Sequence, residues 1–371
     1  MAEYMILSIN PGSTSTKIGV FKGDKEVFKT GIQHAKEDLA KFAKVGDQKD
    51  YRLQLVLDEL EKHGIKLEDI DAFAARGGSL GPIEGGVYAV NDEMLNAVVA
   101  AKRGSHPANL AAQMAAEMSK KNGKPAFIVN GPTVDEYDDL ARLTGLKGVY
   151  RKSRGHALNQ KEIGHRYAEK QGKKYEDMNL IIAHIGGGIS VVAHRKGRMV
   201  DASDASWGEG PMAPTRTGTI TLVDVLEQLK KGVDPEVLRS KSQLTGGWTD
   251  HLGTDNGMEV RKMIDEGNKY AKLVFDTTVY QICKFIGAMS IPLKGQVDAI
   301  VLTGGLSNDK NMTAQITEYV KFLAPVEVMA GEYELEGLAA GVARALDGTE
   351  EVKQYSEKDI FSDFEARHDI K

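Results

Sequence analysis

The chain has 371 residues, of which 41% are apolar, and a single core of that size is unusual, so the length predicts two domains. A formal net charge of −5 without any basic block argues against a general nucleic-acid binder. No run approaches the roughly 18 apolar residues of a membrane span. The only cysteine, Cys283, lies in an apolar stretch, and the first residues lack the charged start and cleavage site of a leader, so we expect none. These features predict a cytoplasmic protein that does not bind a membrane.

Apolar patterning predicts strands that alternate with helices along the chain. The expected strands span residues 4–10, 17–21, 70–75, 125–130, 179–185, 189–194, 297–303 and 326–329. The expected helices are 51–63, one capped by Asn91, one after Pro107, one starting at His156, 221–231, 256–266, 268–290, 309–322 and 334–346. This alternation indicates the α/β class.

Both halves of the chain open with a strand, a glycine-containing turn and a second strand, which indicates weak internal duplication. We therefore expect two similar lobes, residues 1–177 and 178–347. The charged segment 348–371 after them is expected to be a packed helix or a tail. Two similar lobes imply an interdomain cleft, and the glycine turns should face it because ligands bind beyond the ends of the strands.

Three turns follow expected strands and are candidates for binding phosphate. The first, N-P-G-S-T-S-T-K at 10–17, offers backbone N–H groups, hydroxyls and one lysine, although a plain hairpin turn would look the same. It is not a Walker loop, because G-x-x-x-x-G-K is absent and a strand follows. The others are H-I-G-G-G at 184–188 and T-G-G-L-S-N at 303–308. Three such turns, divided between two halves, predict a nucleotide site.

Two arginines lie beside turns, and the planar guanidinium suits carboxylate and phosphate. Arg76 precedes Gly77 and Gly78, and Arg216 lies in P-T-R-T-G. Each could equally be a surface ion-pair partner. His156 starts a helix, where a neutral imidazole is favoured, but a capping histidine would sit there too.

Three acidic residues also have two interpretations. Asp135, in P-T-V-D-E-Y, is a candidate site residue or simply an acid at a helix N-terminus. Glu332 and Glu334, in A-G-E-Y-E-L-E, could complement a helix dipole or reach Mg²⁺, which keeps most of its waters and needs few protein carboxylates.

Together the motifs resemble the butyrate kinase family, within the acetate and propionate kinase group. The resemblance rests on I-N-P-G-S-T-S-T-K, P-I-E-G-G-V-Y-A-V-N, H-A-L-N-Q-K and A-H-I-G-G-G-I-S-V, in order between about residues 4 and 347. It implies two RNase H-like (actin-like ATPase) domains with mixed sheets flanked by helices. It also implies reversible, magnesium-dependent transfer of a phosphoryl group from ATP to butyrate, giving ADP and butyryl phosphate, in a homo-oligomer.

The resemblance assigns roles to individual residues. The first lobe would bind carboxylate and phosphate, and the second the nucleotide. Catalysis would involve Arg76, Asp135, His156 and Arg216. The nucleotide would contact Asn10, Gly12, Ser13, Ser15, Lys17, His184, Gly186, Gly187, Gly188, Gly304, Gly305 and Asn308. The acid would contact Arg76, His106 and Arg216, and magnesium would be near Asn10 and Glu332 or Glu334.

Some segments depart from the family pattern. Asn10 and His184 stand where many actin-like nucleotidases have aspartate, which suits the acetate kinase branch. S-H-P-A-N at 105–109 and Arg154-Gly155 are unusual and border the expected acid pocket. Acetate, propionate, isobutyrate and isovalerate therefore stay open as substrates. More distant alternatives are a sugar kinase, for which no catalytic aspartate is evident, and a non-enzymatic ATP switch.

Overall fold

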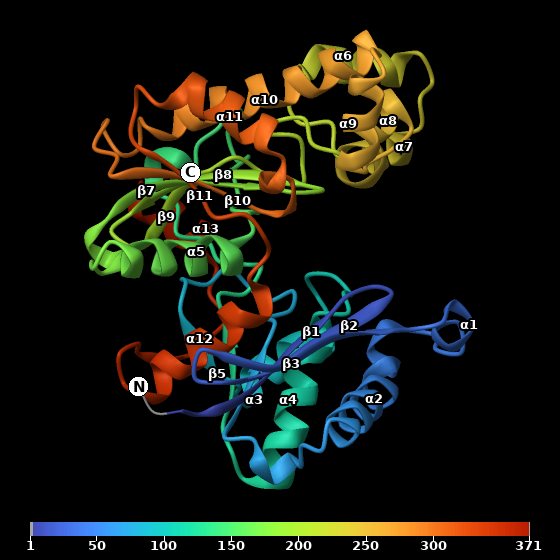
Figure 1. Cartoon of the computed structure of the whole chain (residues 1–371), viewed down its shortest axis with the longest axis vertical. Coiled ribbons are helices and arrows are strands. Elements are labelled where there is room, and N and C mark those ends of the chain that lie inside the picture. The colour runs from blue at the N-terminus through green and yellow to red at the C-terminus, as the bar shows by residue number, and fades with distance from the viewer. Residues whose placement is uncertain (1–2, 371) are drawn as a thin grey trace. The chain divides into compact units, whose positions relative to one another are not determined.

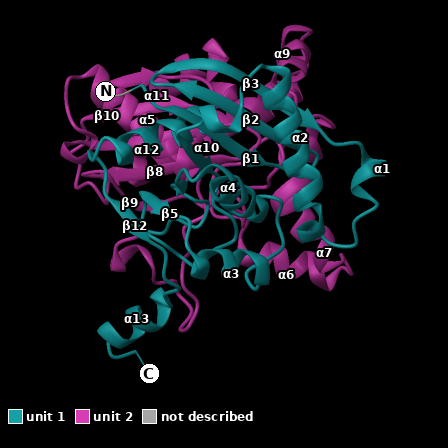
Figure 2. Cartoon of the chain, turned by 90° about the horizontal axis from the view of Figure 1, so that it is seen from below, with its two compact units in different colours: residues 1–135, 333–371 teal, residues 136–332 magenta. Residues whose placement is uncertain are grey.

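The computed structural model describes residues 3–370, which form two compact units (Figures 1 and 2). Unit 1 consists of Met1–Asp135 and Tyr333–Lys371, and unit 2 is the continuous segment Glu136–Glu332. No helix within residues 3–370 is both long and apolar enough to cross a membrane.

Unit 1 is built on a mixed seven-stranded sheet of order β12-β5-β6-β4-β1-β2-β3. Its strands are β1 (Met5–Pro11), β2 (Ser15–Lys22), β3 (Lys25–Gln33), β4 (Ala72–Ala75), β5 (Val87–Ala89), β6 (Ala126–Val129) and β12 (Val352–Gln354). Its helices are α1 (Lys36–Leu39), α2 (Lys49–Lys62), α3 (Asp92–Ala100), α4 (Asn109–Asn122), α12 (Glu334–Leu346) and α13 (Ile360–Arg367). β1 pairs antiparallel with β2 and parallel with β4, so the hairpin continues directly into the buried centre of the sheet.

Unit 2 is built on a mixed five-stranded sheet of order β11-β10-β7-β8-β9. The strands are β7 (Asn179–Ile185), β8 (Ile189–Arg195), β9 (Arg198–Ala202), β10 (Ala299–Thr303) and β11 (Val326–Val328). The helices are α5 (Ala157–Lys170), α6 (Leu222–Lys230), α7 (Pro235–Ser240), α8 (Trp248–Leu252), α9 (Gly257–Asp265), α10 (Lys269–Met289) and α11 (Lys310–Val320). Figure 1 shows this sheet between α5 on one side and α10 with α11 on the other.

The expected strands and helices are present, with ends that differ by a few residues. The Asn91 side chain caps α3 by accepting the Met94 N–H at 2.9 Å, as expected. Pro107 differs slightly from its expected place, because α4 begins only at Asn109. The patterning missed β3, β5, β9 and β12. β3 is an edge strand whose sequence, K-E-V-F-K-T-G-I-Q, is mostly polar and mostly exposed, so it lacks the apolar run of a buried strand.

The two units divide the chain at different places from the expected boundaries at 177/178 and 347/348. The reason is that two helices pack on sheets other than those expected from chain order. α5 contacts β7 of unit 2, while α12 returns to β1, β2, β4 and β6 of unit 1. α12 approaches β6 so closely that a side chain at Gly341 would lie 2.5 Å from Val129 Cγ1. Burial therefore decides the division, and the sequence boundary of the duplicated motifs does not.

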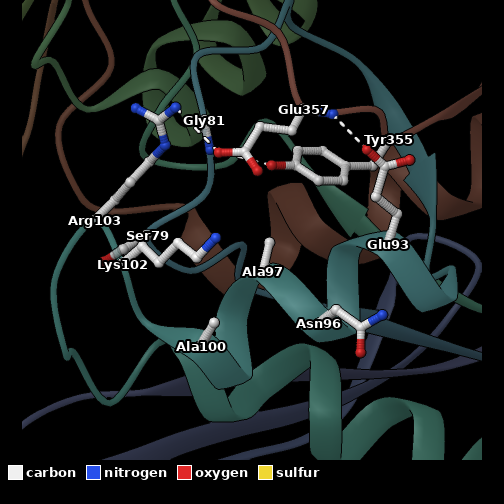
Figure 3. A pocket seen from close by; sticks show the side chains of 10 residues that line it. All are labelled: Ser79, Gly81, Glu93, Asn96, Ala97, Ala100, Lys102, Arg103, Tyr355 and Glu357. Carbon is white, nitrogen blue, oxygen red and sulfur yellow. Dashed lines mark hydrogen bonds and ion pairs between the residues drawn. The ribbon is translucent and has the colours of Figure 1, made fainter.

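The first part of the C-terminal segment packs within unit 1. β12 adds to the sheet beside β5, and Tyr355 is 2% exposed. The Tyr355 hydroxyl accepts the Gly81 N–H at 3.3 Å, and Glu93 accepts the Glu357 N–H at 2.8 Å (Figure 3). These residues help to line a cavity of about 230 Å³ next to α3. The segment thus fixes the loop that follows Arg76.

Replacing Tyr355 should show how much this packing contributes. We expect Tyr355→Ala to lower the free energy of unfolding by about 3–5 kcal/mol, because it empties a fully buried aromatic site. Denaturant titration would measure the change. Tyr319→Ala, at a side chain that is 52% exposed in unit 2, is the control and should cost less than about 1 kcal/mol. Equal losses in both variants would mean that the C-terminal segment contributes nothing specific.

Candidate active site

The first phosphate-binding candidate is the turn of the β1–β2 hairpin in unit 1. Asn10 and Lys17 are paired in register across the two strands, and the Gly12 N–H donates to Ser15 O at 2.7 Å. Ser13 is exposed at the tip, and Ser15 is partly buried. The expected hairpin is therefore confirmed. Polar residues lie at its tip, and backbone hydrogen bonds pair the two strands below the tip.

A buried arginine from α2 holds this turn. The Arg52 side chain, 0% exposed, donates to three turn carbonyls: Gly12 O at 2.9 Å, Ser13 O at 3.2 Å and Ser15 O at 3.3 Å. Sequence reasoning missed this residue. The available signal was its position four residues before Val56, on the same helical face as Val56 and Leu60.

A histidine supports the same turn. His34 Nε2 hydrogen-bonds the Thr16 hydroxyl at 2.8 Å, and Thr16 in turn accepts from Arg52. Burial, together with the positive charge of Arg52, lowers the pKa of His34 to about 4. The imidazole is therefore neutral near pH 7, so it adds no second positive charge beside Arg52.

Arg76, Asn10 and Glu334 come together beside this hairpin. Asn10 Nδ2 donates to Glu334 Oε2 at 2.7 Å, and Arg76 Nη2 lies 3.5 Å from Glu334 Oε1. Arg76 Nη1 is buried and has no hydrogen-bond partner within residues 3–370. An unsatisfied guanidinium donor fits an anionic ligand, and the amide–carboxylate pair offers oxygen atoms of the kind that Mg²⁺ prefers.

The remaining residues expected in unit 1 are less closely assembled. His106 has an exposed side chain, and partial desolvation with the charges of Arg76 and Arg52 lowers its pKa. Its Nδ1 accepts the Ala108 N–H at 3.1 Å. Asp135 is 8% exposed in a loop and not in a helix, and its N–H donates to Ile83 O. The interpretation of Asp135 as a helix N-terminal acid is therefore wrong.

In unit 2, the turn after β7 is packed directly against Arg216. A side chain at Gly188 would lie 1.6 Å from Arg216 Nη1, so any other residue there would displace the guanidinium from this position. Arg216 donates to Ala205 O at 2.5 Å and to Gln243 O at 3.3 Å. Thr215 donates its N–H and its hydroxyl to Gly187 O. The loop that carries Thr215 and Arg216 therefore packs directly on the glycine turn at 184–188. The sequence predicted that both belong to the phosphate site.

The third glycine turn lies against the second. Gly304 has φ +91°, and a side chain there would lie 2.4 Å from Ile185 O at the end of β7. Its N–H and carbonyl pair with those of Gly331. Asn308 is exposed, and its side chain donates to Gly305 O at 2.9 Å, so it orders its own turn.

Two histidines complete the set in unit 2. His156 occupies the N-cap position of α5, as expected from the sequence, but its side chain makes no capping hydrogen bond. Its ring stacks on that of His184 with centroids 3.9 Å apart. Asn159 Nδ2 donates to His184 Nδ1 at 2.9 Å, which leaves the ring proton of a neutral His184 on Nε2. That nitrogen would lie 3.3 Å from a Cβ at Gly186. His184 therefore presents a donor to the glycine turn.

The two candidate magnesium residues differ in environment. Glu334 begins α12 and contacts Asn10 and Arg76, whereas Glu332 is exposed and belongs to unit 2. Within the described part of the chain, no three His, Cys, Asp or Glu side chains gather as a metal site. A cation bound by Asn10 and Glu334 would thus keep most of its coordination from water and substrate, which suits Mg²⁺.

Comparison with known proteins places this chain in a family. Residues 144–330 match the model of the acetokinase family. The chain is 44% identical over 354 residues to a protein named probable butyrate kinase from Coprothermobacter proteolyticus, covering 95% of this chain and 99% of the relative. The fold is similar to that of the acetate kinase of Porphyromonas gingivalis (TM-score 0.72, 20% identity, 92% and 100% covered). A propionate kinase of Francisella tularensis is also similar (TM-score 0.70, 18% identity, 91% and 98% covered).

The fold is of the actin-like type, and the family and the butyrate kinase relative define a phosphotransferase whose acceptor is a carboxyl group. The chain belongs to the acetokinase family. Its fold class and its type of activity are therefore those that the sequence motifs predicted.

The support of the hairpin by Arg52 can be tested directly. Lysine has a single ammonium group and cannot replace the fork that serves three carbonyls. We expect Arg52→Lys to lower the free energy of unfolding by about 2–4 kcal/mol and to raise the KM for ATP. Calorimetry and steady-state kinetics would measure both. Arg239→Lys, whose side chain is 68% exposed, is the control and should be neutral within about 0.5 kcal/mol. An unchanged KM for ATP in folded Arg52→Lys would contradict a positioning role.

Proposed function

We propose that this kinase transfers the terminal phosphoryl group between ATP and a short-chain fatty acid, with butyrate as the acid and magnesium as the cofactor. The observation that carries the proposal is the packing of the Arg216 guanidinium on Gly188, in a chain 44% identical to a probable butyrate kinase. An arginine held this close to a glycine turn can meet a phosphate bound by that turn.

The proposed roles follow the chemistry of each group. In unit 1, Arg76 would bind the acid with His106, and the hairpin residues Asn10, Gly12, Ser13, Ser15 and Lys17 would contact phosphate. In unit 2, His184, Gly186–Gly188 and Gly304–Asn308 would bind the nucleotide. Arg216 would neutralise the transferring group, His156 would donate to it, and Asp135 would orient an arginine. The proposal requires the residues named in unit 1 and those named in unit 2 to take part in the same reaction.

The transfer itself needs little covalent chemistry from the protein. A carboxylate is already ionised near pH 7, so no strong general base is required. Phosphoryl transfer depends on positioning and on neutralising charge, which arginine and polar turn groups supply. We therefore propose direct in-line transfer from ATP to the acid. Bound magnesium would add charge neutralisation at the phosphates, near Asn10 and Glu334. A phosphorylated enzyme that turns over competently would contradict the direct route.

The preferred acid is testable with a panel of substrates. One methylene in an apolar pocket is worth about 1–3 kcal/mol, so kcat/KM for butyrate should exceed that for acetate at least tenfold. A hydroxamate assay with ATP and straight and branched C2–C5 acids would measure this, with glucose as a control acceptor. A maximum at acetate, propionate, isobutyrate or isovalerate would reassign the substrate. Phosphorylation of glucose but of no acid would reject the proposal.

Arg216 provides the sharpest test of the site. We expect Arg216→Ala to lower kcat by about 10³-fold or more, because it removes the group that neutralises the transferring phosphoryl. Arg216→Lys keeps the positive charge but not the planar guanidinium, so its kcat should lie between those of the unsubstituted protein and Arg216→Ala. Arg239→Ala is the exposed control, and circular dichroism would verify folding. More than a tenth of the activity in Arg216→Ala would contradict this role.

The magnesium residue can be identified by a matched pair of variants. We expect Glu334→Gln to raise the Mg²⁺ concentration for half-maximal rate about tenfold or more. Glu332→Gln makes the same chemical change at an exposed position and should have little effect. Titrating the rate with Mg²⁺ at saturating substrates compares them. The reverse order would move the magnesium site to Glu332.

The family resemblance also supports a homo-oligomer, a dimer or larger. A single cysteine, Cys283, and the composition of the chain support a cytoplasmic location.

A further inference from the structure

A continuous chain of hydrogen bonds runs through the interior of unit 2 to His156. Tyr175 Oη bonds His194 Nδ1 at 2.5 Å, and His194 Nε2 bonds Gln160 Oε1 at 3.1 Å. Gln160 Nε2 then donates to Ser190 Oγ at 3.1 Å, and Ser190 Oγ bonds His156 Nδ1 at 2.9 Å. The three residues between Tyr175 and His156 are each 0% exposed. Water therefore cannot take the place of any link inside the chain.

The amide of Gln160 fixes the direction of this chain. Its Nε2 also donates to the backbone carbonyl of Ser190 at 3.2 Å, and a carbonyl can only accept, so the amide cannot be turned around. Oε1 therefore faces His194 and requires the proton of that ring to be on Nε2. The Ser190 hydroxyl has two hydrogen-bond neighbours, Gln160 Nε2 and His156 Nδ1. Gln160 Nε2 can only donate, so His156 Nδ1 is the acceptor in reach of the buried hydroxyl proton.

Tyr175 and His194, at the end of the hydrogen-bond chain remote from His156, have protonation states that fit the same direction of donation. Burial is the main reason why the pKa of His194 is lowered to about 3; the charge of Lys161 lowers it further, and Glu136 opposes the shift. The ring is therefore neutral, with one nitrogen as donor and one as acceptor. Burial also raises the pKa of Tyr175 well above its usual value, so the phenol keeps its proton and donates it to His194 Nδ1.

We propose that Ser190 and Gln160 are positioning residues that fix the tautomer of the neutral form of His156, with the ring proton on Nε2. The inference rests on the proposed role of His156 in the reaction, because an Nε2–H is what would donate to the charge on the transferring phosphoryl group. Asn159 does the same for the stacked ring of His184. Both imidazoles then act as donors, and neither needs to be charged.

The tautomer can be observed without measuring activity. In the full-length protein labelled with ¹⁵N-histidine, long-range ¹H–¹⁵N spectra distinguish Nε2–H from Nδ1–H, and His156→Ala identifies the signals of that ring. We expect the proton on Nε2 in the unsubstituted protein and a mixture of tautomers in Ser190→Ala. A proton on Nδ1 in the unsubstituted protein, whether the ring is neutral or charged, would overturn the inference.

Kinetics supply the second readout. We expect Ser190→Ala to lower kcat about tenfold, with the KM values for ATP and acid changed less than threefold, because the ring remains but its donor is no longer fixed. Ser190→Cys, with a weak S–H donor, should recover part of the loss. Ser290→Ala is the matched control: it removes a hydroxyl that is also buried, bonded to Gly287 O at 2.7 Å at the end of α10. It should leave kcat unchanged.

Two further variants separate the possible failures. Gln160→Met keeps the size of the side chain but frees the Ser190 hydroxyl to rotate, so it should lower kcat in the same way as Ser190→Ala. It takes the place of Ser190→Ala if that variant fails to fold. If His156→Ala keeps full activity, the proposed role of His156 is wrong. If His156→Ala is inactive while Ser190→Ala and Gln160→Met match Ser290→Ala, only the positioning inference is wrong.

Discussion

A turn that receives phosphate through its backbone must have its carbonyl oxygens satisfied elsewhere, because a bare carbonyl would repel the anion. In this protein, neighbouring residues supply such partners. Arg52 is buried beneath the hairpin of unit 1 and serves three of its carbonyls. In unit 2, Thr215 serves the Gly187 carbonyl of the glycine turn, and the Arg216 guanidinium lies on Gly188. Each turn thus has a guanidinium beside it, where positive charge favours an anion.

The proposed phosphate contacts of Asn10 and His184 fit the absence of an aspartate at either position. A carboxylate acceptor arrives as an anion, so a further negative charge beside bound phosphates would oppose its binding. An amide and an imidazole keep the hydrogen-bonding capacity of those positions without the negative charge of a carboxylate. The one carboxylate drawn into the set of unit 1, Glu334, is balanced by Arg76 at 3.5 Å. Charge in each unit is therefore arranged through pairs of side chains and not through a single catalytic base.

The sequence predicted the local features well and the long-range ones poorly. Glycine turns, strand ends, the Asn91 cap and the start of a helix at His156 are encoded within a few residues, and all of them are present. The contact between Arg76 and Glu334 joins residues far apart in the chain, and nothing local to either predicts it. Arg52 was overlooked because a charged residue beside an apolar face is normally exposed. The division into units depended on which sheet α5 and α12 cover, which patterning within each helix does not specify. The roles of the individual site residues remain predictions.

The discontinuity of unit 1 has a consequence for biosynthesis. A ribosome releases residues 3–135 long before α12 and β12, yet the sheet of unit 1 needs α12 over β1, β2, β4 and β6 to bury its apolar face. The continuous unit 2 has all its strands once residue 332 has emerged. The middle of the polypeptide can therefore complete its folding before the beginning does. During that interval the nascent N-terminal strands expose apolar surface, which makes them natural clients for a chaperone.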